Sequence, residues 1–404
     1  MPDPRLLRVP ALLLATLLGA DLIACDARQQ DARQEEVEPG ADSAASHRTG
    51  PVQAPTTGDQ RRDSAVLLQY HFVAEDTPRS TSVTPEEFAG HMDWLDENDF
   101  TVLALPELLN RLRAGESVPP RSVAITFDDA YISVHEAAFP LLKARGWPFT
   151  VFVNTAAIDA PGRSFASWAQ LAEMQEAGAT IANHSVSHAY LVRGDAAADR
   201  ESDTAFRARM NAEIGAAENR IEARLGVRHK LIAYPYGEYD RRVRDWVRDR
   251  GYIGIGQHSG AIWSGSDFTA LPRFPLSGDY AAMDQFAEKM RMAPLRVLDP
   301  AALPPQPLAT DEPRPRLEFR VRAGTIRAEA LACYASGQGR IETDIDVAAG
   351  AEDGPGIVIV STRAPSSVPF GRSRYNCTAP QVGGGWAWFS HPWLRENRDG
   401  VTPP

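Results

Sequence analysis

The segment Val123-Ala-Ile-Thr-Phe-Asp-Asp129 decides the fold, because a short apolar run ends there in two adjacent acidic residues. Short apolar runs without regular polar alternation are typical of parallel strands that are buried on both faces of a sheet. Comparable runs lie on both sides of this segment in the sequence, and they predict further strands of the same kind. They cover residues 65–70, 149–153, 180–182, 231–233 and 252–255.

Helical patterns separate these runs. Thr84-Pro-Glu-Glu87 is a capping box with proline in the first turn, which predicts the start of a helix with an apolar face. Other predicted helices end before a glycine, and they cover residues 141–145, 167–177 and 204–225. The alternation predicts an α/β barrel or an open α/β sheet over residues 65–293, with the chemistry at the carboxyl ends of the strands.

The C-terminal region lacks comparable helical patterns. Residues 294–315 are rich in proline, which predicts an extended linker. Beyond it, alternating and clustered apolar residues with turn residues between them predict a small all-β, sandwich-like domain over residues 316–404. The predicted strands cover residues 317–321, 326–331, 341–347, 357–360 and 386–388.

Aromatic side chains and one histidine gather near the end of this region. Aromatic residues at alternating strand positions are more often part of a core, and a platform that stacks on sugar rings is the alternative. The residues are Trp386, Trp388, Phe389, His391 and Trp393.

The N-terminus has the features of a targeting segment. Residues 1–24 combine two arginines with an apolar stretch that is too short to cross a bilayer, which needs about 20 residues. The segment resembles a bacterial lipobox, which implies cleavage before Cys25 and attachment of lipid to its sulfur. A plain secretory signal with cleavage elsewhere is the alternative. Residues 25–64 are polar and predict a flexible tether.

Composition excludes several classes of protein. The chain has 404 residues, 43% of them hydrophobic and 24% charged, which fits a globular protein of about two domains rather than a disordered or polytopic membrane protein. Its net charge of −11, without a basic patch, makes nucleic acid an unfavourable partner. Protein partners cannot be predicted from these quantities.

The two remaining cysteines, Cys333 and Cys377, lie in the C-terminal region. An exported protein meets an oxidising compartment, so a disulfide between them is expected, with two buried free thiols as the alternative.

Candidate catalytic residues follow two of the predicted strands. Asp128 and Asp129 end one strand, and His184 and His188 follow another, four residues apart on a segment that could be helical. One carboxylate with two imidazoles leaves coordination positions open on a divalent metal ion, of which zinc is the first choice. The second carboxylate could then act as a base on water, as a hydrolase requires.

Three motifs, Thr126-Phe-Asp-Asp129, His184-Ser-Val-Ser-His188 and Tyr234-Pro-Tyr-Gly237, resemble those of the polysaccharide deacetylase superfamily, carbohydrate esterase family four. The early Tyr70-His71 and the region from Phe88 to Leu109 look most like the branch that includes periplasmic poly-β-1,6-N-acetylglucosamine deacetylases. The resemblance implies a distorted (β/α) barrel with fewer than eight repeats. It also implies Asp128 as general base, Asp129, His184 and His188 as metal ligands, Tyr236 as a backbone donor to the oxyanion, and Tyr234 and Pro235 at the substrate.

Two features of the family are missing. Ala233 occupies the position where many members carry an arginine that orients the base, and Arg273 is our candidate replacement. The late histidine that protonates the leaving amine is also not recognisable. His258 is the first candidate for that role and His71 the second.

These observations predict a lipid-anchored enzyme of the bacterial cell envelope, facing the periplasm, that removes acetyl groups from the N-acetylated sugars of a polysaccharide. Two alternatives remain at this point. One is an esterase that acts on O-acetylated glycans such as xylan, and the other is a polysaccharide-binding lipoprotein with weak catalysis.

Overall fold

The computed structural model describes residues 62–160, 162–192, 201–303, 312–348 and 356–395. The predicted signal segment, Cys25 and nearly all of the predicted tether lie outside these ranges. Among the helices that are described, none is both long and apolar enough to cross a membrane.

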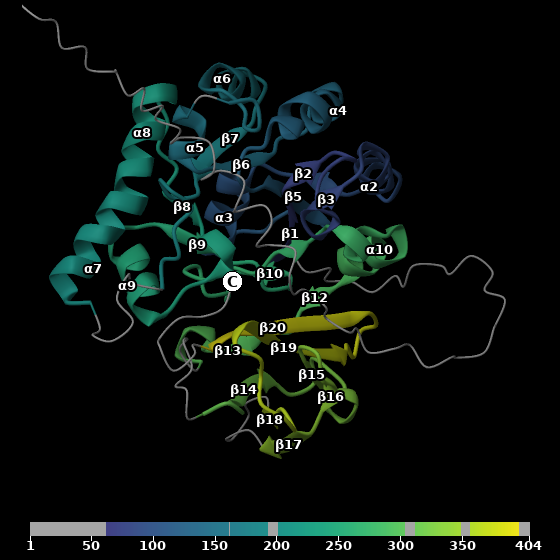
Figure 1. Cartoon of the computed structure of the whole chain (residues 1–404). Coiled ribbons are helices and arrows are strands. Elements are labelled where there is room, and N and C mark those ends of the chain that lie inside the picture. Colours follow the sequence, from purple (N-terminus) through teal and green to yellow (C-terminus); the bar gives the residue numbers. More distant parts are fainter. Residues whose placement is uncertain (1–61, 161, 193–200, 304–311, 349–355, 396–404) are drawn as a thin grey trace, which may run out of the picture. The chain divides into compact units, whose positions relative to one another are not determined.

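A curled parallel sheet forms the centre of the first region (Figure 1). Its strands pair in the order of the sequence, and each is buried along nearly its whole length, as their continuous apolar runs predict. Asp128 and His184 therefore follow strands that end at the same edge of the sheet, with one strand between them. The strands are β1 (Ser64–Tyr70), β5 (Ser122–Phe127), β6 (Thr150–Val153), β7 (Thr180–Asn183), β8 (Leu231–Ala233) and β9 (Ile253–Ile255).

Residues 271–275 bring the two edges of this sheet together. Leu271 pairs with Ile255 of β9, and β11 (Phe274–Pro275) pairs in parallel with β1. We call residues 271–275 the closing segment. Its ladder is short because Pro272 and Pro275 have no N–H to donate. β10 (Ile262–Trp263) pairs antiparallel with the start of β1. The predicted distorted (β/α) barrel is confirmed.

Helices cover the outside of the sheet. α2 begins with the predicted capping box at Thr84 and buries Phe88, Met92 and Leu95, and α4 and α8 end at the left-handed glycines Gly146 and Gly226. The helices are α2 (Pro85–Glu97), α3 (Leu105–Arg113), α4 (Phe139–Arg145), α5 (Thr155–Asp159), α6 (Trp168–Glu176), α7 (Asp203–Met210), α8 (Ala216–Leu225), α9 (Arg241–Asp249) and α10 (Met283–Arg291). Short strands β2 (Phe72–Val73), β3 (Ser82–Val83) and β4 (Thr101–Val102) accompany them.

The C-terminal region consists of two sheets that enclose one apolar core, which confirms the predicted all-β class. Cys333 and Cys377 are directly opposite each other in one sheet and form a disulfide. The first sheet has the order β12 (Ala293–Pro294), β20 (Trp386–Arg395), β19 (Gly371–Pro380), β15 (Ala332–Ala335), β16 (Gly339–Ile341). The second has the order β13 (Val297–Leu298), β14 (Arg316–Arg322), β18 (Ile357–Arg363), β17 (Thr343–Ala348).

Two local predictions differ from the structure. β12 and β13 belong to these sheets although they lie at or within the predicted proline-rich linker, because Leu295 and Val297 are apolar enough to be buried. The predicted strand over residues 326–331 is instead a turn with a short 3-10 helix at Ala328–Ala330. Its Ala-Glu-Ala sequence favours a helical turn.

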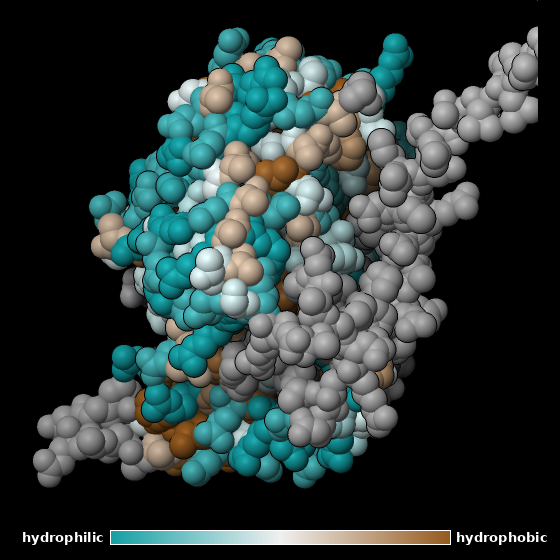
Figure 2. All heavy atoms as spheres, turned by 60° about the vertical axis from the view of Figure 1, so that its left-hand side comes forward, coloured by the Kyte–Doolittle hydropathy of each residue, from teal (hydrophilic) through white to brown (hydrophobic). Residues whose placement is uncertain are grey.

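Most of the C-terminal aromatic side chains belong to cores. Trp393 is fully buried against Tyr375, and Phe389 packs on Phe319. Trp388 packs instead on Phe274 of the closing segment. Trp386 alone among the four aromatic residues is largely exposed. The face of the molecule in Figure 2 is mainly hydrophilic, as expected when apolar residues fill the cores.

Candidate active site

The sequence motifs meet at the carboxyl edge of the barrel. Asp128 and Asp129 directly follow β5, and His184 directly follows β7. His188 reaches the same place through a loop rather than the helix that its spacing allowed. Ser185 and His188 have φ of 68° and 57°, values that an α-helix does not contain.

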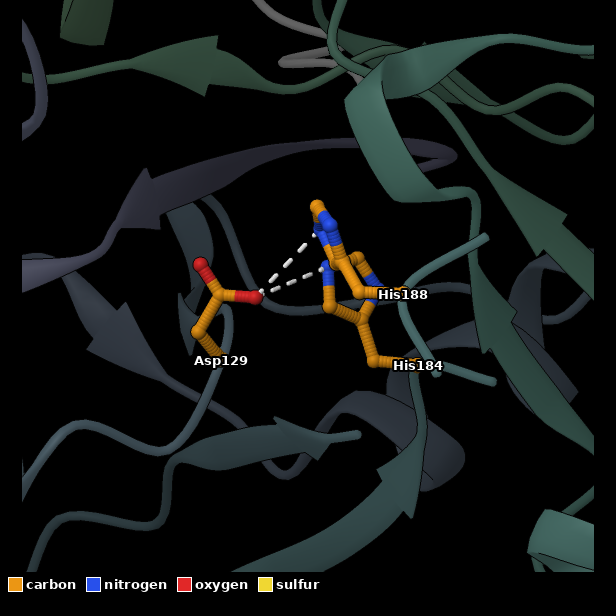
Figure 3. Close-up of side chains that lie close together, drawn as sticks. All are labelled: Asp129, His184 and His188. Carbon is orange, nitrogen blue, oxygen red and sulfur yellow. Dashed lines mark ion pairs between the residues drawn. The ribbon is translucent and has the colours of Figure 1, made fainter. Parts of the chain in front are cut away.

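Three side chains in this group form a candidate metal site (Figure 3). Oδ1 of Asp129 lies 3.5 Å from Nε2 of His184 and 3.4 Å from Nε2 of His188. The potential ligand atoms of all three residues lie within 4.8 Å of one another. One carboxylate and two imidazoles facing a common point are a ligand set that suits a divalent transition metal.

The orientation of His184 fits a metal ligand. Its Nδ1 lies 2.8 Å from the carbonyl oxygen of Ala233, a contact that fixes the ring and leaves Nε2 directed at Asp129. Within the described residues, no hydrogen-bond partner reaches this buried Nε2. Burial lowers the pKa of His184 to about 4, so the ring is neutral at pH 7 and has a lone pair to offer. Asn154 in turn donates to Asp129.

Asp128 is fully buried and bound by two polar side chains. Arg273 donates to both carboxylate oxygens, each at 2.7 Å, and Gln69 donates to Oδ2 at 2.7 Å. Burial by itself would raise the pKa of Asp128, but the nearby Arg273 and His184 hold that pKa well below its usual range. The carboxylate is therefore ionised at all physiological pH values.

The closing segment places Arg273. The side chain is fully buried, and besides Asp128 it donates to the Gly256 carbonyl at 2.9 Å and to the Thr126 hydroxyl at 3.0 Å. Arg273 thus contacts the carboxylate that the missing family arginine would orient. Ala233, at the position of that arginine, contributes only its backbone carbonyl to His184.

The third motif forms a tight turn beside the metal-site residues. Tyr236 has a left-handed φ of 58°, and its ring stacks on Tyr190 and lies 4.4 Å from the ring of His188. Tyr234 is fully buried, with its hydroxyl donating to the Thr269 carbonyl, and Pro235 is buried as well. The side chain of Tyr234 lies in an apolar cluster of the barrel. The expected contact of Tyr234 and Pro235 with substrate stays a prediction.

The two candidate proton donors are placed differently. His71 Nε2 lies 3.9 Å from Oδ2 of Asp128, and the ring is partly exposed. His258 is buried, and its Nδ1 faces Gly256 so closely that a Cβ on this glycine would lie 2.7 Å away. Burial, with nearby cations, lowers its pKa to about 3. Its ring packs near Tyr239. The structure thus brings His71 close to Asp128, whereas the ring of His258 lies against Gly256 and Tyr239.

Several residues at the site were not predicted from the sequence. Gln69 holds Asp128, Asn154 holds Asp129, and Tyr190 stacks on Tyr236. Gln69 could have been identified from the sequence, because it is a polar residue within an otherwise apolar predicted strand. Asn154 likewise directly follows the apolar run of β6.

The backbone around the site is unusual. Left-handed φ values of non-glycine residues are uncommon and tend to cluster where a function requires them. Here they occur in all three motifs, at Asp129, Ser185, His188 and Tyr236, and also at Ala130, directly after the first motif.

Comparisons with known proteins agree with this arrangement. Residues 115–255 match the family model described as polysaccharide deacetylase. The chain is 27% identical over 237 residues to the poly-β-1,6-N-acetyl-D-glucosamine N-deacetylase of Staphylococcus epidermidis, covering 54% of this chain and 81% of that protein. It is 22% identical over 240 residues to the enzyme of the same name from Escherichia coli K12, covering 52% of this chain and 35% of that protein.

A solved structure supports the fold. The deacetylase PplD of Streptococcus pyogenes, in complex with acetate, superimposes with a TM-score of 0.50 at 20% sequence identity. The match covers 56% of this chain and 98% of that chain.

Proposed function

We propose that this chain, in which residues 115–255 form a polysaccharide deacetylase domain, is a metal-dependent hydrolase that removes acetyl groups from N-acetylated sugars of a polysaccharide. The single observation that carries the proposal is the buried Asp128, paired with Arg273, directly beside the Asp129, His184 and His188 group. The names of the two relatives make a polymer of β-1,6-linked N-acetylglucosamine the first substrate to test.

Asp129, His184 and His188 would hold the metal ion, and zinc is the first candidate. Two observations support this assignment: the buried Nε2 of His184 has no hydrogen-bond partner in the described part of the chain, and both imidazoles lie close to the Asp129 carboxylate. When bound, a divalent cation acts as a Lewis acid that makes water more acidic and polarises the acetyl carbonyl.

The other residues would move protons and stabilise charge. Asp128 accepts a proton from the attacking water, whose oxygen forms a bond to the acetyl carbon. The backbone N–H of Tyr236 stabilises the oxyanion. The C–N bond then breaks, and His71 gives a proton to the nitrogen, so that acetate and a free amine leave. Arg273 and Gln69 hold Asp128 in the position that this transfer requires.

The location of the enzyme is a separate part of the proposal. A lipidated Cys25 would anchor the chain in the bacterial envelope, and the polar residues 25–64 would tether residues 65–293 on the periplasmic side. Residues 316–404 would form the second domain. Labelling with a radioactive fatty acid, lost in Cys25→Ser, tests the anchor.

The alternatives can be ranked against specific observations. The missing arginine and the missing late histidine of the family favour a weakly catalytic binding protein. That argument is weaker in the structure, because Arg273 pairs with Asp128 and His71 lies close to the same carboxylate. An O-acetyl esterase remains the second candidate, because the same attack by water cleaves esters.

The test is acetate release from oligomers of N-acetylglucosamine, compared with O-acetylated xylan fragments. The proposal expects release from the first, loss of release with a chelator, and loss in Asp128→Asn. Asp344→Asn, an exposed aspartate of β17, is the matched control. Full activity of Asp128→Asn would contradict the proposal.

A further inference from the structure

One face of the C-terminal sheet that contains β19 and β20 contacts the barrel. Odd-numbered residues of β19, such as Tyr375 and Cys377, lie in the sandwich core. Because side chains alternate along a strand, even-numbered residues share the opposite face. Trp388 pairs with Thr378 in register, so it lies on that face, and it packs on Phe274 of the closing segment.

Arg372, the first residue of β19 on this face, reaches the turn that carries Tyr236. Its Nη1 lies 3.6 Å from Oε1 of Glu238, whose side chain is only 2% exposed. Its guanidinium also lies over the ring of Tyr236, 5.3 Å from the ring centre. Buried carboxylates and aromatic faces both attract a guanidinium. One side chain of the C-terminal sheet therefore contacts two residues of this turn.

The turn has a backbone that depends on its surroundings. Tyr236 and Gly237 have φ of 58° and 69°, so two consecutive residues are left-handed. Only glycine fits at the second position, because an added Cβ would lie 2.7 Å from Cβ of Gln257. A non-glycine residue in this conformation persists where neighbouring groups hold it.

The same turn contacts the metal-site residues. The ring of Tyr236 lies 4.4 Å from that of His188 and 4.0 Å from that of Tyr190. Its backbone N–H is the proposed donor to the oxyanion. A displacement of the turn would therefore move this donor and loosen the packing on His188, which would slow the chemical step more than it would weaken substrate binding.

We propose that Arg372 is a positioning residue of the deacetylase site, through which the C-terminal sheet holds the Pro235–Gly237 turn in its reactive conformation. Arg372 acts through Tyr236 and Glu238 and does not touch the reacting atoms. The proposal rests on the proposed function, because the N–H of Tyr236 serves catalysis only if the site forms an oxyanion. It assigns the C-terminal sheets a part in catalysis besides any contact with glycan.

The kinetic test uses the full chain loaded with zinc and an N-acetylglucosamine oligomer. Arg372→Ala should lower kcat about tenfold, which corresponds to about 1.4 kcal/mol, with KM and zinc affinity changed less than about twofold. Arg372→Lys should recover part of the loss because it keeps the charge. Arg340→Ala, on the exposed edge strand β16 of the same sheet, should behave as wild type.

A second measurement does not depend on activity. Hydrogen–deuterium exchange at residues 234–239 should be faster in Arg372→Ala than in wild type or Arg340→Ala. If Arg372 acts partly through Glu238, then Glu238→Gln should speed exchange at residues 234–239 less in the Arg372→Ala background than in wild type.

The outcomes separate the two proposals. A wild-type chain that releases no acetate in the presence of zinc would overturn the proposed function, and the exchange measurement would still decide the role of Arg372. Unchanged exchange in Arg372→Ala would overturn that role whatever the activity. Faster exchange with an unchanged kcat would also overturn it, because the turn would then not limit catalysis.

Discussion

Arg273 binds both carboxylate oxygens of Asp128 at 2.7 Å, although 145 residues separate the two in the sequence. Asp128 follows a central strand of the barrel, and Arg273 lies on the segment that closes it. Formation of this pair therefore requires a closed barrel. The fold and the state of the proposed catalytic base are coupled through one buried contact.

Arg273→Lys should lower kcat by about 10- to 100-fold, the range typical of residues that orient a catalytic group from outside the reacting atoms. A lysine cannot reproduce the two parallel hydrogen bonds that a guanidinium makes to a carboxylate. Steady-state kinetics of acetate release, with Arg340→Lys as control, measures this. Unchanged kcat would mean that Asp128 needs no orientation by Arg273.

His71→Ala should lower amide deacetylation by about 10²- to 10⁴-fold, as expected for loss of a general acid. An aryl acetate ester, whose leaving group needs no proton, should lose far less. Asp128→Asn should lower both reactions, because both require activated water. An equal loss of both reactions in His71→Ala would contradict its role as the acid, and a large loss in a folded His258→Gln would support His258 instead.

The stability of the barrel should depend on pH through His91. Burial lowers the pKa of His91 to about 4, despite its contact with the Ala281 carbonyl. Unfolded histidine titrates near 6.5, so the unfolded chain binds the proton first as pH falls. The contribution of neutral His91 to the free energy of unfolding is therefore fully present above pH 6.5. It is lost as the pH falls from 6.5 to about 4, and the free energy of unfolding decreases by up to about 3 kcal/mol.

Urea unfolding at pH 7 and pH 5 measures this effect of His91. The variant His91→Gln should be less stable than wild type at pH 7, because Gln cannot stack on Phe286. It should lose less stability than wild type between the two pH values. The same loss in both proteins would show that His91 does not carry the effect and that other buried groups do.

The disulfide should stabilise the C-terminal sheets. It closes a separation of 44 residues, and removing such a bond costs about 2–4 kcal/mol of unfolding free energy. The double variant Cys333→Ser/Cys377→Ser should therefore unfold at lower urea concentration than wild type. Reduction of the wild-type protein should reproduce the shift, whereas the reductant should not change the double variant.

The sequence predicts the barrel and the metal-site residues because both follow from local patterns. Buried parallel strands appear as continuous apolar runs, and their carboxyl ends must meet at one edge. Asp129 and His184 come together for this reason, whereas His188 reaches them through the loop that follows β7. The all-β class of the C-terminal region also follows from alternation, as in β14, where every second residue is buried.

Other features depend on tertiary packing that no local pattern contains. His258 follows a strand, as the motif residues do, but the strand position does not determine which way its ring turns. The contact of Arg273 with Asp128 depends on how the barrel closes, so the sequence supports it only as a candidate. Arg372 could not be found, because its contact with the Tyr236 turn requires the C-terminal sheet to pack on the barrel.

Titration of metal-free protein with zinc, followed by acetate release from an N-acetylglucosamine oligomer, tests the central claim most directly. The account predicts that activity is absent without metal and saturates at about one equivalent, and that His184→Ala binds zinc far more weakly and stays inactive. Full acetate release by demonstrably metal-free protein would contradict it.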